Sequence, residues 1–126
     1  MQAYTDAFRV GPFIAWIIPC LFLPFFFLIL MVSLHTLTSE ENKIWGLLAL
    51  VFAIAYATLL SACYYIQIVV VEYNLVHHST EGLRLWLFAS PYPHSIPGAL
   101  EGIGYAFMSL SFIFASRLFS GEYVAD

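Results

Sequence analysis

The sequence predicts an all-α integral membrane protein, a single transmembrane domain over residues 1–126 built as a bundle of three transmembrane helices with a short interfacial helix between the second and third. Of its 126 residues, 62% are hydrophobic and 10% are charged, against about a quarter charged in ordinary soluble domains. A soluble chain of this length could not bury so much apolar surface, because small domains keep a large fraction of their surface exposed. The apolar residues also form long blocks, which favours a membrane.

The first two blocks are uncharged runs of 26 and 28 residues, at 12–37 and 44–71. Each exceeds the roughly 20 residues that cross a hydrocarbon core. The first run is also far longer than the apolar region of a secretory signal peptide, about 7–15 residues. We therefore expect two transmembrane helices, joined by a tight polar turn at residues 38–43.

The third predicted span is long enough to cross the membrane only if it includes the carboxylate of Glu101. The run without charge after Glu101 covers only residues 102–116, or roughly 22 Å of helix, which is too short to cross. Starting the helix at Ile96 gives a span over about 96–118, with Ser95 as its N-cap and Pro97 in the first turn, where proline is tolerated. This reading places Glu101 inside the membrane helix.

The link between the second and third spans contains residues 80–90, a stretch too short to cross and too apolar to be free in water. We expect a short helix there at the membrane interface, with Arg84 and Trp86 at headgroup level.

The distribution of lysine and arginine does not fix the orientation of the protein in the membrane. With three spans, Arg9 and Arg84 fall on one side, and Lys43 and Arg117 fall on the other.

Several classes of function are disfavoured by what the sequence lacks. The formal net charge is −4 and no basic cluster occurs, so nucleic acid is not an expected partner. Cys20 and Cys63 lie in apolar spans without a CxxC or Cys–His spacing, and there they behave as small hydrophobes. Phosphate-loop and hydrolase motifs are also missing. We predict no metal and no cofactor.

A candidate polar site gathers where the second span ends and the third begins, because these ends share one membrane face. It comprises Gln67, His94, Glu101 and Tyr105. On the second span, helical spacing puts Cys63 on the same side as Gln67. A carboxylate within a membrane is costly without a partner, water or a proton. Glu101 is therefore either a helix-pairing group or a functional one that handles protons, cations or a ligand.

Small residues on the third span predict helix packing beside this site. Gly98 and Gly102 form a small-xxx-small pair, which Ser109 continues, and such a face lets another helix approach closely. Within the lipid bilayer, we expect its partner to be either a second copy of the chain, in a homo-oligomer, or another transmembrane helix.

Two stretches, at residues 64–74 with Gln67 and at 93–110 with His94, Glu101 and Tyr105, carry a recognisable pattern. Through them the chain, over about residues 50–120, resembles a family of uncharacterised bacterial polytopic membrane proteins. The family pattern has a Tyr-Phe-x-Gln element, an Asn-Pro-His element and an Ala-Leu-Glu-x-x-Gly-Tyr-x-x-Met-Ser helix. The matching positions here are Gln67, Pro93, His94, Glu101, Gly104, Tyr105, Met108 and Ser109. Tyr92 stands where the pattern has asparagine. Family members are longer, so the chain is a fragment or a short relative. The resemblance implies a bacterial inner-membrane protein and no particular activity.

Three classes of function remain open at this point. The first is a non-catalytic helical membrane component or assembly subunit, with Glu101 at a helix interface. The second is a transporter or ion pathway that uses Glu101 as an intramembrane carboxylate. The third is a membrane enzyme in which His94 and Glu101 form an acid–base pair, although no nucleophile or metal set accompanies them.

Overall fold

The computed structural model describes residues 9–77 and 94–119, which are almost entirely helical and contain no strand. In chain order, the elements are α2 (Val10–Leu37), the 3-10 turn η1 (Glu40–Asn42), α3 (Lys43–Ile66), the π-helix η2 (Gln67–Glu72), α4 (Tyr73–Val76), α6 (Ile96–Ser116) and the 3-10 turn η3 (Arg117–Phe119).

Three of the resulting helices are long and apolar enough to cross a membrane, at Val10–Leu37, Glu40–Val76 and Ile96–Phe119. They coincide within a few residues with the predicted spans, except that the second continues to Val76 through η2 and α4. The interfacial helix predicted at 80–90 lies outside the described residues.

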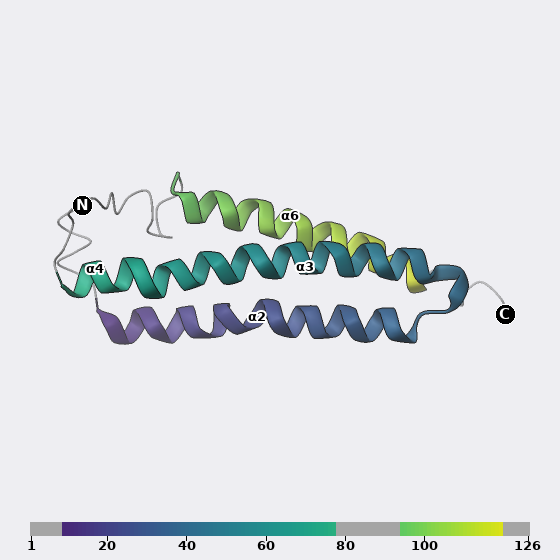
Figure 1. The fold of residues 1–126 in the computed structure, drawn as a ribbon, viewed down its shortest axis with the longest axis horizontal. Coiled ribbons are helices and arrows are strands. Elements are labelled where there is room, and N and C mark those ends of the chain that lie inside the picture. The colour runs from purple at the N-terminus through teal and green to yellow at the C-terminus, as the bar shows by residue number, and fades with distance from the viewer. Residues whose placement is uncertain (1–8, 78–93, 120–126) are drawn as a thin grey trace.

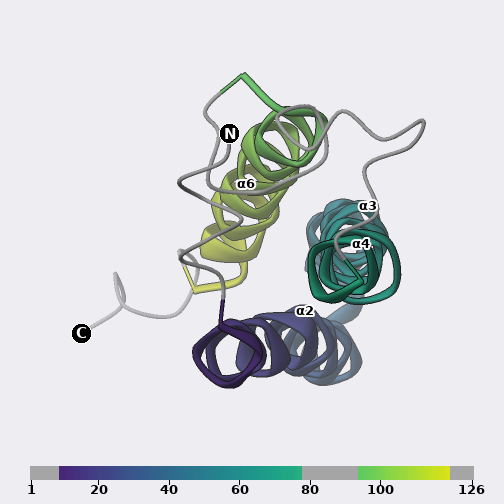
Figure 2. The same cartoon turned by 90° about the vertical axis from the view of Figure 1, so that its left-hand side faces the viewer.

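The bundle is organised around α3, which packs against both α2 and α6 (Figures 1 and 2). The turn at η1 reverses the chain, so α2 and α3 form an antiparallel hairpin. Phe27 of α2 meets Phe112 in the C-terminal half of α6, with ring centroids 5.1 Å apart. Both outer helices therefore take part in one core although α3 forms most of the contacts.

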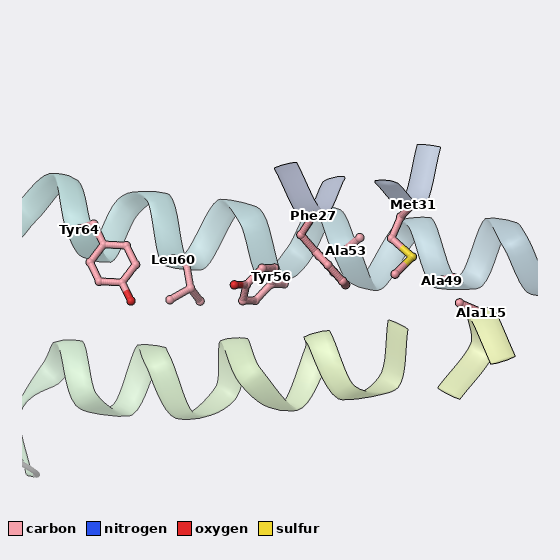
Figure 3. Close-up of a cluster of buried hydrophobic side chains, with 8 residues drawn as sticks. All are labelled: Phe27, Met31, Ala49, Ala53, Tyr56, Leu60, Tyr64 and Ala115. Carbon is pink, nitrogen blue, oxygen red and sulfur yellow. The ribbon is translucent and has the colours of Figure 1, made fainter. Parts of the chain in front are cut away.

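The α3–α6 contact follows a heptad-like seam on each helix. The seam residues of α3 are Ala49, Ala53, Tyr56, Leu60 and Cys63, all buried. Those of α6 are Pro97, Glu101, Gly104, Met108, Ser111 and Ala115, which are buried or half-buried. Steps of three and four residues keep a seam on one face of a helix and permit close packing at a shallow crossing angle. Figure 3 shows the cluster formed with Phe27 and Met31 of α2.

Two local features fix the ends of the α3–α6 seam. The hydroxyl of Ser95 accepts a hydrogen bond from the amide of Gly98 at 3.1 Å, which confirms the predicted N-cap. Pro97 lies in the first turn, where its missing N–H costs no helical bond. Near the other end, the hydroxyl of Ser111 donates to the carbonyl of Ala49 at 2.7 Å, a buried bond between helices.

The outer surface of the bundle is apolar. Large side chains such as Phe26 and Ile29 on α2 and Ile113 on α6 are 67%, 61% and 58% exposed. Exposed hydroxyls on the same helices bond back to their own helix: Ser33 donates to the carbonyl of Ile29, and Ser109 to that of Tyr105, each at 2.9 Å. The polar groups of these serines are thus satisfied without any other molecule.

Candidate functional site

Glu101 lies on the seam of α6, where it faces α3. Cap residue Ser95 starts the helix, and Glu101 follows about one and a half turns later. Its side chain is half-buried. The prediction that this carboxylate points toward another helix agrees with the position of Cys63, described next.

The thiol of Cys63 touches two groups of α6 at once. Its sulfur lies 3.8 Å from Oε1 of Glu101 and 3.8 Å from the carbonyl oxygen of Pro97. Cys63 is fully buried, so the contact is shielded from solvent. A thiol is a weak donor, and here it links α3 to the first turns of α6.

Two tyrosines extend this polar contact along the bundle. The phenol groups of Tyr64 and Tyr105 lie close enough to interact, and the carboxyl group of Glu101 lies within electrostatic reach of Tyr64. Tyr64 is buried and its ring meets that of Trp16 edge-on, with centroids 6.5 Å apart. We call Cys63, Tyr64, Glu101 and Tyr105 the polar cluster. It joins α3 to α6, and α2 covers it through Trp16.

The other predicted site residues lie around this cluster. Gln67 is fully buried, lies about one turn beyond Cys63, and begins the π-helix η2. His94 is exposed and immediately precedes the cap residue Ser95. These observations do not test whether His94 and Glu101 act as an acid–base pair, so that pairing stays a prediction.

The predicted small-residue face of α6 is not the face that meets α3. Gly102 and Ser109 are exposed, and a methyl group added at Gly102 would meet no atom within 4 Å. Gly98 is half-buried. The close approach to α3 occurs at Gly104, where an added Cβ would lie 2.1 Å from Cδ2 of Leu60. A helix from outside the described residues stays the predicted partner of Gly98, Gly102 and Ser109.

Sequence reasoning missed the parts of the site that come from α3. It placed Cys63 on the side of Gln67 but assigned it only a hydrophobic role, and it gave no role to Tyr64. The seam of α6 at 97, 101, 104, 108, 111 and 115 was a usable signal, because these positions alternate steps of four and three. Among residues 9–77 and 94–119, no three His, Cys, Asp or Glu side chains gather as metal ligands.

Chemically, the polar cluster offers a carboxyl group, a thiol and two phenols inside a helix interface. Such groups can hold helices together by hydrogen bonds, which are worth about 0.6 kcal/mol each on average between membrane helices. They can also bind a proton or a small ligand.

No protein-family model, curated protein or solved structure matches the chain, so the resemblance to bacterial membrane proteins stays a prediction.

Proposed function

We propose that the protein is a multi-pass integral membrane protein of the bacterial inner membrane. It acts there as a non-catalytic helical component, assembling with itself or with other transmembrane helices. The observation that carries the proposal is the distribution of apolar surface. Only 22%, 39% and 17% of the residues in the most apolar windows of the three spans are buried. A surface of this kind suits lipid and not water.

In this proposal the polar cluster holds α6 against α3. Support comes from the position of Glu101 on the packing seam and from its contact with Cys63 at 3.8 Å. A functional carboxylate in a transport route would face a water-filled path or a substrate. Here Glu101 contacts the thiol of Cys63 on the neighbouring helix, which favours the structural role.

Membrane insertion is tested by alkaline extraction of membranes from cells that express the full chain, together with reporters fused at either end. We expect the protein to stay in the membrane pellet. Because three spans put the two ends on opposite sides, the N- and C-terminal reporters should respond oppositely. Release into the alkaline supernatant, or reporters on the same side, would contradict a three-span protein.

The role of Glu101 is tested by comparing Glu101→Ala with Glu101→Gln in one detergent. Glutamine keeps an oxygen that can accept from Cys63, whereas alanine leaves the buried thiol without this acceptor. We expect Glu101→Ala to lower the free energy of unfolding by about 1–3 kcal/mol and Glu101→Gln to lower it by less. Glu41→Ala, in the exposed turn, is the control.

If both Glu101 variants are as stable as the wild type, the carboxyl group does not hold the helices together. The transporter alternative then becomes the better explanation of this residue, and ion-flux measurements in vesicles are the next step.

A further inference from the structure

A cavity opens at the end of the bundle where the chain turns from α2 into α3. Its volume is about 600 Å³, within the roughly 300–1,000 Å³ that is usual for small-molecule sites in proteins. It lies between the end of α2, the turn at η1 and the turn η3 that follows α6 (Figure 1). The first and third spans end here and the second begins. In the proposed membrane, the cavity therefore lies where the hydrocarbon core meets the lipid headgroups.

The lining of this cavity divides by element. The two helical ends supply its apolar side chains, which are Leu34, Leu37, Leu118 and Phe119. Two of these are well exposed, Leu37 at 84% and Phe119 at 59%. The turn between α2 and α3 supplies its polar residues, which are Thr38, Ser39, Glu41 and Asn42. Apolar walls beside a polar turn fit an amphiphile, which has an apolar and a polar part of its own.

The lining carries a single formal charge, the carboxylate of Glu41. The adjacent Glu40 is paired with Lys43, whereas Glu41 is exposed and forms no ion pair within residues 9–77 and 94–119. Neither Lys43 nor Arg117, the cations described at this end of the bundle, lines the cavity. A carboxylate in this position attracts a cationic group and disfavours an anionic one.

The neutral polar groups of the turn already use hydrogen-bond donors among themselves. The hydroxyl of Thr38 donates to the carbonyl of Leu34 at 2.6 Å, and the side-chain amide of Asn42 donates to the hydroxyl of Ser39. An ionised carboxylate such as Glu41 accepts hydrogen bonds and donates none. The group that complements this lining is therefore a cation with several N–H donors, as a primary ammonium group is.

We propose that the cavity binds a membrane phospholipid whose headgroup carries a primary ammonium. The ammonium group lies against Glu41, and the first part of an acyl chain packs against Leu37 and Phe119. A trimethylated ammonium headgroup has no N–H donor, and a glycerol headgroup has no cation, so neither complements Glu41 as well. The inference rests on the proposed membrane location and does not depend on what the polar cluster does.

Native mass spectrometry of the full chain tests the headgroup. The chain is released from micelles that contain equal amounts of phosphatidylethanolamine, phosphatidylcholine and phosphatidylglycerol with the same acyl chains. We expect the wild type to retain phosphatidylethanolamine at least about threefold more often than either other lipid, the size of effect that one partly exposed ion pair gives. Glu41→Gln keeps the shape of the side chain and should retain the three lipids about equally.

Glu72→Gln is the matched control, because it removes the same charge at the opposite end of the bundle (Figure 1). It should keep the wild-type preference. The proposal is overturned if the wild type does not prefer phosphatidylethanolamine, or if the Glu41 and Glu72 variants keep the preference equally.

Glycerophosphoethanolamine tests the apolar walls, because it has the same headgroup without acyl chains. In large excess it should leave the bound lipid in place, and ready displacement would overturn a lipid site. Alkaline extraction separates this inference from the proposed function. A chain that stays in the membrane pellet without a headgroup preference contradicts the lipid site alone, whereas release into the supernatant contradicts the membrane location.

Discussion

Replacing Gly104 with alanine tests the packing of α6 on α3 most directly. The added Cβ would lie 2.1 Å from Cδ2 and 3.6 Å from Cγ of Leu60. Carbon atoms pack at about 3.5–4.0 Å, so the shortfall at Cδ2 is roughly 1.5 Å. Leu60 is fully buried, so its methyl group has no solvent to move into. Either Leu60 changes rotamer against packed neighbours or α6 moves outward.

The expected magnitude combines two opposing effects. Overpacking a core costs about 1–3 kcal/mol, whereas Gly→Ala in a helix interior recovers up to about 1 kcal/mol. We therefore expect Gly104→Ala to lower the free energy of unfolding by up to about 2 kcal/mol. The assay is reversible unfolding of the purified protein in mixed micelles, followed by circular dichroism.

Gly102→Ala is the matched control, because the same change two residues away meets no atom within 4 Å. It should leave stability unchanged or raise it slightly. Leu60→Ala alone should destabilise the protein through a cavity. Combined with Gly104→Ala, it should cost less than the sum of the two, because the added methyl group partly fills that cavity. Equal stability of the Gly104 and Gly102 variants would refute the close approach at Gly104.

Two further predictions concern polar groups in the helix interfaces. Ser111→Ala removes the bond to the carbonyl of Ala49 and should lower the free energy of unfolding by about 0.6 kcal/mol. Ser109→Ala removes only a bond within α6 and should change the free energy of unfolding little. The same micelle assay measures both variants, and equal effects would contradict the interhelical bond. In the folded protein, a small maleimide should label the partly exposed Cys20 faster than the buried Cys63. Mass spectrometry of the Cys20→Ser and Cys63→Ser variants measures the labelling rate of each remaining cysteine. Faster labelling of Cys63 would contradict its place between the helices.

The sequence was sufficient to predict the helices, because their signals are local. Uncharged length predicted the first two spans. The third was predicted by extending a shorter uncharged run back through Glu101, and the hydroxyl of Ser95 ahead of Pro97 predicted where α6 begins. These features depend on a few neighbouring residues and on the thickness of a bilayer, so no knowledge of the tertiary contacts was needed.

The faces that the helices present to one another were harder to predict. Helix α6 has small residues on two faces, one with Gly102 and one with Gly104, and composition does not distinguish them. The choice depends on Leu60 and Tyr56 of α3, against which Gly104 packs.

The serines that bond back to their own helices also determine how a neighbouring protein could recognise this bundle. Ser33 and Ser109 already donate their hydroxyl protons to carbonyls of their own helices. A helix arriving from outside at these positions can therefore use these hydroxyls only as acceptors, unless it breaks the existing bonds. A partner without a donor there is distinguished by the shapes of the meeting surfaces, and by side chains such as Phe26 and Ile113 that project between them.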